Sequence, residues 1–352
     1  MSPFAVTPPA EMIQAQNKAE TVPDYVGIVP ISDKERDGGF TNRETLQKCL
    51  EYFHRDGMVV ITNAIPEHLV DKMNDMMIAE SKALEERGDV HFHQGKSTRN
   101  MSVCPPMTEE WMMPEFWVNQ HVMDVTEQII GSKPDLSFAR SNVCLPHATG
   151  RQAVHADGPS DVLRFTYMVI ANVFLCDVTP ENGATELWLG THSLNAPEHH
   201  VSEDLGWIKK SSLIERARVR PPIQCSQPKG SICIRDVRMW HSGMPNLTDT
   251  YRIMTSYIYT PPWWNTHMFL TLPKDVKDHV EKWNRVTVKA EYVDEFDNKS
   301  SPFVVNMSQK REHTMVNNGV NGMKYLHNDK KFSPGEPREI TKDYYWTPED
   351  AA

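Results

Sequence analysis

The sequence lacks the features that mark several common classes of protein. None of its six cysteines lies in a Cys-x-x-Cys pair, so neither a zinc ribbon nor a disulfide framework is indicated. The longest mainly apolar run, residues 165–176, falls short of the roughly 20 residues that a membrane helix needs. Residues 1–20 have neither the basic nor the apolar region of a secretory signal. We therefore expect a cytoplasmic protein with no membrane segment.

Positive charge is also scarce. The chain has 37 Lys and Arg against 47 Asp and Glu among its 352 residues, which gives a net charge of −10. A nucleic-acid surface needs clustered Lys and Arg, so nucleic acid is not an expected partner. Hydrophobic residues make up 39% and charged residues 24%, which is typical of a folded globular chain. The expected partner is a small molecule, and the sequence leaves a homodimer open.

The first third of the chain predicts an arm followed by a helical lead-in, within a single catalytic domain spanning residues 1–352. Residues 1–40 are polar and proline-rich without periodicity, as in an N-terminal arm on the surface. Helical spacing starts at Thr41, where Thr-Asn-Arg-Glu resembles a capping box. Residues 58–62 predict a strand and residues 66–86 a second helix, so the lead-in covers residues 41–135.

From residue 136 the sequence pattern changes and predicts a mainly β fold with flanking helices. Short β-rich segments at 171–176, 231–235 and 253–259 alternate with turn sequences, which favours a sandwich or barrel over residues 136–262. A polar stretch at about 195–220 predicts an insertion that could act as a lid. Residues 263–352 form a C-terminal extension with little readable pattern.

One histidine–carboxylate pattern stands out in the β-rich region. An iron that activates O2 needs three protein ligands on one side, and two imidazoles with one carboxylate meet that need. Residues i and i+2 of a strand share a face, so His-x-Asp offers two adjacent ligands. Composition alone supplies about one such triplet, and this chain has three, starting at His54, His155 and His327. The first ends a predicted helix, and the third has no histidine after it. Only His155 and Asp157 are followed by a histidine in a strand-like stretch, His241.

A candidate for binding a dicarboxylate follows the distal histidine. Arg252 lies eleven residues after His241, at the start of another strand-like stretch. A hairpin would return its guanidinium to the pocket, where it suits the far carboxylate of a dicarboxylate. The residues alone therefore support two interpretations about equally. One is an iron oxygenase, and the other is a fold with two unrelated core histidines and a surface arginine.

Three ordered blocks resemble the phytanoyl-CoA dioxygenase family, especially its fungal members that oxidise small natural products. They are Gln-Ala-Val-His-Ala-Asp at 152–157, a block starting Glu-Asn-Gly-Ala-Thr at 181–193, and residues 230–252, within a resemblance that covers roughly residues 45–262. The resemblance implies a double-stranded β-helix, or jelly-roll, core. Ser-Gly-Met at 242–244 departs from the common Gly-Ser-Gly, which puts a supporting hydroxyl in doubt.

The resemblance also implies the site and its chemistry. His155, Asp157 and His241 would bind Fe(II), Arg252 would hold the 5-carboxylate of 2-oxoglutarate, and Gln152 and Thr185 would contact its other polar groups. O2 would be the oxidant, with ascorbate as reductant in vitro. The substrate would be a small, largely apolar secondary metabolite that undergoes hydroxylation, desaturation or radical rearrangement. The tryptophans expected to line its cavity are Trp188, Trp240, Trp263 and Trp264.

Three alternatives stay open at this point. A non-catalytic jelly-roll binding protein would not need the complete ligand set. A zinc hydrolase would leave Arg252 unexplained. An acyl-CoA hydroxylase of the same family would need a basic patch for the CoA phosphates, for which the sequence offers Arg216, Arg218 and Arg220.

Overall fold

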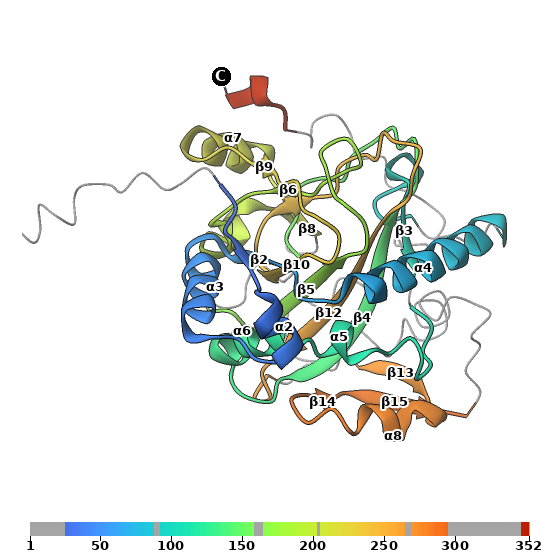
Figure 1. Ribbon diagram of the computed structural model, residues 1–352. Helices are drawn as coiled ribbons and strands as arrows, with labels where there is room; N and C mark the ends of the chain where they lie inside the picture. Colours follow the sequence, from blue (N-terminus) through green and yellow to red (C-terminus); the bar gives the residue numbers. More distant parts are fainter. Residues whose placement is uncertain are drawn as a thin grey trace, which may run out of the picture.

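A large mixed β-sheet forms the centre of the computed structural model (Figure 1). Its strand order is β1-β2-β10-β5-β12-β4-β14, and β3 pairs with the other part of β4. The structure describes residues 25–87, 92–103, 105–157, 165–202, 205–264, 269–294 and 346–351. The strands of the large sheet are β1 (Ile28–Pro30), β2 (Met58–Thr62), β3 (Asn100–Val103), β4 (Asp135–Cys144), β5 (Val169–Phe174), β10 (Ile232–Asp236), β12 (Arg252–Thr260) and β14 (Thr287–Val288).

A smaller sheet faces the large one across the interior. It contains β11 (His241–Ser242), β6 (Glu186–Leu187) and β9 (Ile223–Gln224) in that order. The segment around His155 extends it, because His155 is bridged to His241 on one side and to Trp207 on the other. Trp207 belongs to β8 (Leu205–Ile208), which pairs in turn with β7 (His200–Ser202).

The path of the chain between the two sheets identifies the fold. From β4 the chain crosses to the His155 segment, returns to β5, passes through β6 and β9, returns to β10, crosses to β11 and ends in β12. This repeated crossing between two facing sheets whose central strands are antiparallel is the jelly-roll arrangement. The expected mainly β fold with a double-stranded β-helix core is therefore confirmed.

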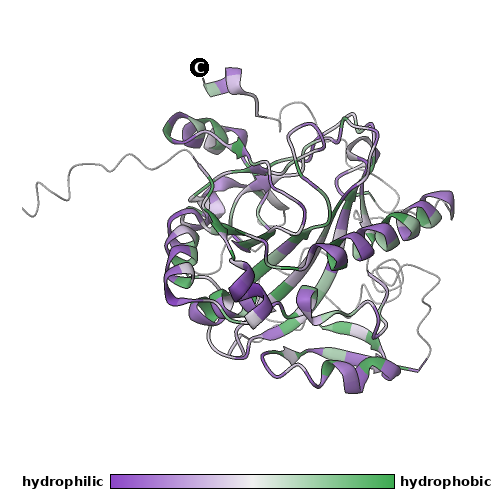
Figure 2. Ribbon diagram, in the orientation of Figure 1, coloured by the Kyte–Doolittle hydropathy of each residue, from purple (hydrophilic) through white to green (hydrophobic). Residues whose placement is uncertain are grey.

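Helices cover the outer face of the large sheet (Figure 1). Alternate residues of β12, such as Ile253 and Tyr257, pack in one core with Phe53 and Met73 of the helices. Figure 2 shows the apolar colour along the central strands and more polar colour on the helices outside them. The helices are α2 (Asp33–Gly38), α3 (Arg43–Asp56), α4 (Glu67–Arg87), α5 (Pro114–Trp117) and α6 (Gln120–Ile130).

The start of α3 differs slightly from the sequence expectation. Its N-cap is Asn42 rather than Thr41, because the Asn42 side chain accepts a hydrogen bond from the Thr45 N–H at 2.9 Å. The reciprocal capping box lies one helix earlier, where Ser32 and Glu35 cap α2. The described part of the expected N-terminal arm is also ordered, since β1 pairs in parallel with β2.

The predicted insertion and C-terminal extension both contribute to the fold. The insertion supplies β7, β8 and α7 (Lys210–Val219), and β8 joins the edge of the smaller sheet instead of forming a lid. The extension supplies β14 to the large sheet, and a last turn at Pro348–Ala351 lies beside α7, with Lys210 Nζ 2.9 Å from Asp350 Oδ1 (Figure 1). Its other elements are β13 (Leu270–Pro273), α8 (Lys277–Val280) and β15 (Ala290–Val293). No helix in the described ranges is long and apolar enough to cross a membrane.

Candidate metal centre

The structure brings His155, Asp157 and His241 together on the inner face of the smaller sheet. His155 and His241 are opposite each other on adjacent strands, and each donates its backbone N–H to the other's carbonyl at 2.9 Å. Asp157 follows His155 by two residues and so shares its face. One ligand atom from each of the three lies within 4.8 Å of the others. The Asp157 carboxylate is 3.6 Å from His155 Nε2 and 3.5 Å from His241 Nε2.

Both imidazoles are held in the form that binds a metal. His155 Nδ1 lies 2.8 Å from the Ala153 carbonyl and His241 Nδ1 lies 3.0 Å from the Met239 carbonyl. A carbonyl can only accept, so each Nδ1 carries the proton and each Nε2 lone pair faces the cluster. Burial lowers the pKa of both histidines, which keeps the rings neutral.

Asp157 is held in the charged form. Burial acts to raise the pKa of its carboxyl, but Arg235, His241 and His155 together hold that pKa well below its usual value. Arg235 Nη2 donates a hydrogen bond to Asp157 Oδ2. Two neutral imidazoles and one carboxylate, with an open side toward the cavity, form a ligand set that suits Fe(II).

The cluster lies in the wall of a cavity of about 210 Å³ between the two sheets. The wall is mainly polar, which differs from the apolar cavity expected from the sequence. Asn172 and Asn142 come from the inner face of the large sheet, and Gln94 and His93 come from the segment before β3. Among the described residues that line this cavity, the cations are Arg140, Arg235 and Arg252, and the carboxylate is Asp157.

Arg252 has the geometry of a binding site for a carboxylate. It starts β12 opposite Cys144 and is only 2% exposed. Nη2 donates to the Gly183 carbonyl at 3.0 Å and to Cys144 Sγ at 2.7 Å. Nε and Nη1 are buried without a hydrogen-bond partner among the described residues. Unpaired buried donors on a charged group are costly, and a carboxylate in the cavity would satisfy both.

Gln152 and Thr185 also line the cavity. Gln152 Oε1 accepts the backbone N–H of Gly243 at 3.0 Å. A Cβ at position 243 would lie 2.6 Å from that oxygen, so the glycine makes room for the amide. Ser242, the hydroxyl that the sequence left in doubt, is fully buried and donates to the Gln152 carbonyl at 2.7 Å. Its hydroxyl therefore fixes the backbone beside the cavity.

The four tryptophans expected in the cavity wall lie elsewhere in the structure. Trp188 and Trp240 are fully buried on the other side of the smaller sheet, in a cluster with Trp346. The reason is strand alternation: Trp240 precedes the inward-facing His241 and therefore points outward. Trp263 is 61% exposed, and Trp264 packs on Tyr167 with ring centroids 4.9 Å apart. None of the four is among the described residues that line the cavity, which corrects their expected role.

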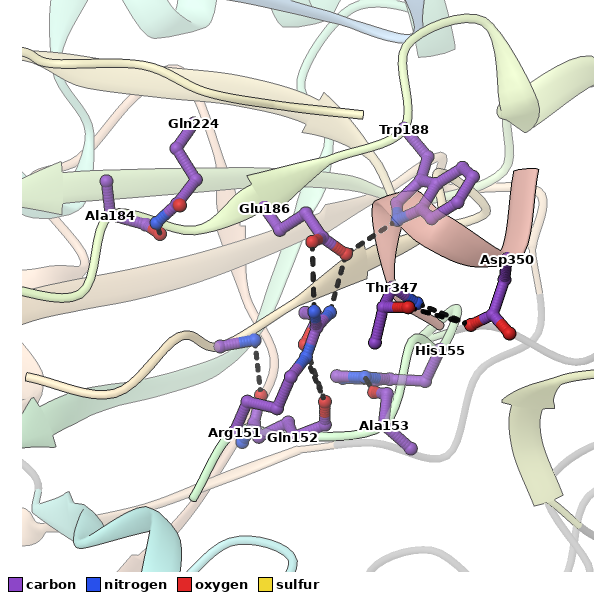
Figure 3. A network of polar contacts seen from close by, with 12 residues as sticks. Arg151, Gln152, Ala153, His155, Ala184, Glu186, Trp188, Gln224, Thr347 and Asp350 are labelled. Carbon is purple, nitrogen blue, oxygen red and sulfur yellow. Dashed lines mark hydrogen bonds and ion pairs between the residues drawn. The ribbon is translucent and has the colours of Figure 1, made fainter. Parts of the chain in front are cut away.

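A polar network supports the smaller sheet around Trp188 (Figure 3). Arg151, next to Gln152, forms a two-pronged ion pair with Glu186 at 2.6 and 3.1 Å. Glu186 Oε1 also accepts from Trp188 Nε1 at 3.0 Å. In Figure 3 the last turn of the chain, with Thr347 and Asp350, lies near Trp188. The network therefore links the segment of Gln152 and His155 to β6 on the outer side of the smaller sheet.

Arg235 and His93 were not identified from the sequence as parts of the site. Arg235 lies two residues after Cys233 on β10, so both face inward, and strand periodicity was the signal that could have revealed it. His93 is the second histidine of the sequence His-Phe-His at 91–93. In the structure it lines the cavity, with Nε2 3.0 Å from Ser102 Oγ, while His91 lies outside the described residues.

The other His-x-Asp sequences and the arginines proposed for CoA phosphates do not contribute to the cavity wall among the described residues. Asp56, the carboxylate of the first His-x-Asp, is fully buried, and Arg220 Nη1 donates to it at 2.8 Å. Arg216 donates to the Leu189 carbonyl at 2.6 Å. Two of the three arginines that could have bound CoA phosphates thus face inward, and only Arg218 is exposed. The third His-x-Asp, at 327–329, lies outside the described residues.

Comparison with known proteins relates this site to a family. Residues 53–254 match the family model described as phytanoyl-CoA dioxygenase (PhyH). A crystal structure of the epimerase SnoN in complex with Fe3+, alpha ketoglutarate and nogalamycin RO is 20% identical, with a TM-score of 0.51 over 62% of this chain and 85% of that one. HygX from Streptomyces hygroscopicus, with nickel and 2-oxoglutarate bound, is 16% identical, with a TM-score of 0.46 over 66% of this chain and 91% of that one.

Proposed function

The chain belongs to the phytanoyl-CoA dioxygenase family, and we propose that it oxidises a small metabolite with Fe(II) and 2-oxoglutarate in the cavity between its two sheets. In this proposal His155, Asp157 and His241 hold the iron. The family makes the chain a non-haem iron, 2-oxoglutarate-dependent oxygenase. The residue assignments and the type of substrate are the steps that we add.

One observation carries the assignment of the metal ligands. The Nε2 atoms of two carbonyl-anchored imidazoles and a carboxylate converge on the cavity. A structural histidine pair has no need for both Nδ1 protons to be fixed in this way, whereas a metal site does. A carboxylate that stays ionised beside Arg235 completes the set.

Arg252 supports 2-oxoglutarate as the co-substrate. Its two unpaired guanidinium nitrogens face a cavity that also holds the metal ligands. A dicarboxylate can place one carboxylate on this guanidinium while its 2-oxo acid end lies toward the ligand cluster. Gln152 and Thr185, in the same wall, would contact its remaining polar atoms. A zinc hydrolase would leave these donors unused, and a binding module would have no need of the complete set of metal ligands beside them.

Different residues have different roles in the proposed reaction. When bound, iron supplies the activation of O2, coupled to oxidative decarboxylation of 2-oxoglutarate, that oxidises a C–H bond of the substrate. Arg235 orients Asp157 and keeps its carboxyl group ionised, and Arg252 orients the co-substrate. The smaller sheet fixes the imidazoles, so that the site is preorganised before the substrate enters. A cavity of about 210 Å³ between two sheets favours a small metabolite over a protein surface as substrate.

The test is reconstitution with a matched histidine control. Purified protein given Fe(II), 2-oxoglutarate and ascorbate should produce succinate, and under anaerobic conditions it should show the weak visible absorption band of an Fe(II)–2-oxoglutarate complex. His155→Ala should lose both signals. His54→Ala, which changes the exposed histidine of another His-x-Asp, should keep both. A wild-type protein without the band, or an unaffected His155→Ala, would refute the assignment.

A further inference from the structure

The apolar layer behind the metal ligands is completed by a turn from the far end of the sequence. We propose that Trp346, in the turn at residues 346–351, is a positioning residue of the metal centre, because it packs in this layer. This role rests on the function proposed above, since it requires a metal on His155, Asp157 and His241. It gives a function to a part of the C-terminal extension in which the sequence shows little pattern.

The side chains that alternate with the metal ligands enter one apolar cluster. Val154 and Ala156 flank His155, and because successive residues of a strand point to opposite faces, both lie on the side away from the cavity. Trp240, which precedes His241, lies in the same cluster. Its other buried members are Trp188, Ile208, Leu213, Ala217 and Trp346. A shift of this layer therefore moves the backbone that carries the ligands, because close-packed interiors transmit strain.

Trp346 is connected to the segment of His241 through Trp188. The indole rings of Trp346 and Trp188 are 5.1 Å apart and pack edge to face at 75°. The backbone N–H of Trp188 donates to the Trp240 carbonyl at 3.1 Å, and Leu187 pairs with His241 across the smaller sheet. One ring contact and one backbone hydrogen bond therefore lead from the turn to a ligand segment.

The turn has attachments of its own that present Trp346 to the cluster. Asp350 Oδ2 accepts the backbone N–H of Thr347 at 2.8 Å and closes the turn (Figure 3). Asp350 Oδ1 also pairs with Lys210 Nζ of α7 at 2.9 Å. Both charged side chains are partly exposed, and such a pair contributes little to stability. The burial of the Trp346 ring therefore supplies most of the free energy that docks the turn.

Loss of the Trp346 ring should weaken metal binding. It leaves a void behind the ligand segments, because a packed core collapses only partly into the space of a deleted side chain. Changes that support metal ligands indirectly lower metal affinity about 10–100-fold, which is the reduction that we expect for Trp346→Ala. The coupling is reciprocal, so a bound metal must favour the docked turn by the same factor.

The first experiment compares two tryptophans of equal burial. Mn(II) is titrated by calorimetry into metal-free wild type, Trp346→Ala and Trp283→Ala. Trp283 is 7% exposed and Trp346 is 6% exposed, but Trp283 packs on Trp117 in the core outside the large sheet. Both variants should unfold at lower urea concentration than the wild type, because each loses a buried ring. Only Trp346→Ala should bind Mn(II) more weakly.

The second experiment uses the wild type alone and so does not depend on the folding of a variant. Hydrogen exchange of the peptide that contains residues 346–351 is followed by mass spectrometry with and without saturating Mn(II). Exchange should slow about 10–100-fold when Mn(II) is bound, as reciprocal coupling requires. A peptide covering α8, in the same extension, is the control and should exchange at the same rate in both conditions.

The outcomes separate this role from the proposed function. If Trp346→Ala folds and binds Mn(II) as tightly as Trp283→Ala does, the role of Trp346 is wrong. If Trp346→Ala does not fold, the exchange experiment decides, and a turn that exchanges equally fast with and without Mn(II) contradicts the role. A wild type that binds no Mn(II) refutes the proposed metal site itself.

Discussion

Gly206 allows β8 to pack against the strand that carries two of the metal ligands. The Ala156 N–H, between His155 and Asp157, donates to the Gly206 carbonyl at 2.9 Å. A Cβ at position 206 would lie 2.3 Å from the Ala156 carbonyl oxygen. Gly206→Ala therefore forces apart two backbones that have no flexible side chain between them.

The size of the expected effect follows from this distance. Real Cβ contacts essentially never fall below 3.0 Å, so one of the strands must move by the difference from 2.3 Å, or about 0.7 Å. A ligand set tolerates displacements of about 0.5 Å before its geometry suffers. We expect the affinity for a divalent metal to fall about 10–100-fold, as with other changes that support ligands indirectly. Overpacking should also cost about 1–3 kcal/mol of unfolding free energy.

The assay is titration of Mn(II) into metal-free protein by calorimetry, with circular dichroism to verify the fold. Gly38→Ala is the matched control. Its added Cβ would lie 2.7 Å from the Phe40 ring, which is 41% exposed and free to turn toward solvent. That variant should bind Mn(II) as the wild type does. A folded Gly206→Ala protein with unchanged Mn(II) affinity would show that β8 does not hold the ligand strand.

Three further changes test other parts of the structure. Arg252→Lys should raise the KM for 2-oxoglutarate about 10–100-fold while leaving Mn(II) affinity unchanged, because lysine cannot form the two-pronged contact; equal losses of both would contradict this role. Asp56→Asn should lower the unfolding free energy in urea by about 3 kcal/mol, because it removes the buried carboxylate charge that pairs with the buried guanidinium of Arg220. Burial acts to raise the pKa of Glu35, but hydrogen bonds, led by the Ser32 hydroxyl, lower it from 4.5 to about 2. A lowered folded-state pKa stabilises above the unfolded value, so Glu35→Gln should cost up to about 3 kcal/mol at pH 7. This cost should shrink as the pH falls from 4.5 toward 2; a cost independent of pH would contradict it.

The sequence predicted the elements whose periodicity is strong. The helix at 66–86 and the strand at 58–62 match α4 and β2 within a residue, because their apolar spacing follows the faces that they bury. The strand segments at 171–176, 231–235 and 253–259 match β5, β10 and β12 within two residues at each end. These strands are buried on both faces, which gives continuous β-rich runs that are easy to recognise.

Features that depend on pairing between distant segments were not predictable in the same way. The insertion at 195–220 is polar, and nothing in its local pattern shows that β8 joins the ligand strand through Gly206. The burial of the Arg220 side chain depends on its ion pair with Asp56, which is 164 residues away in the sequence. Propensity and periodicity report on one segment at a time, whereas these positions are decided by packing between segments.

The tryptophans could have been placed correctly from the sequence. Once His241 is taken as a ligand that faces the cavity, Trp240 must face the opposite side of the same strand. Thr185 and Trp188 are an odd number of residues apart, so an extended segment cannot turn both to the cavity. The same parity places Arg235 with Cys233 on the inner face of β10. Strand alternation applied from the ligands outward is therefore more informative than the preference of aromatic residues for pockets.

The two faces of the large sheet explain why polarity inside this fold indicates function. Its outer face is apolar and buried under helices, and that burial stabilises the fold. Its inner face carries Arg252 and Arg235, and each has at least one buried guanidinium nitrogen without a hydrogen-bond partner among the described residues. Such groups lower stability, and apolar side chains at the same positions would avoid that loss. In the proposed complex with 2-oxoglutarate, a bound carboxylate would satisfy the donors of Arg252 and recover part of this loss. On the proposed function, the inner face gives up stability for ligand binding, and the outer face supplies the stability that the fold needs.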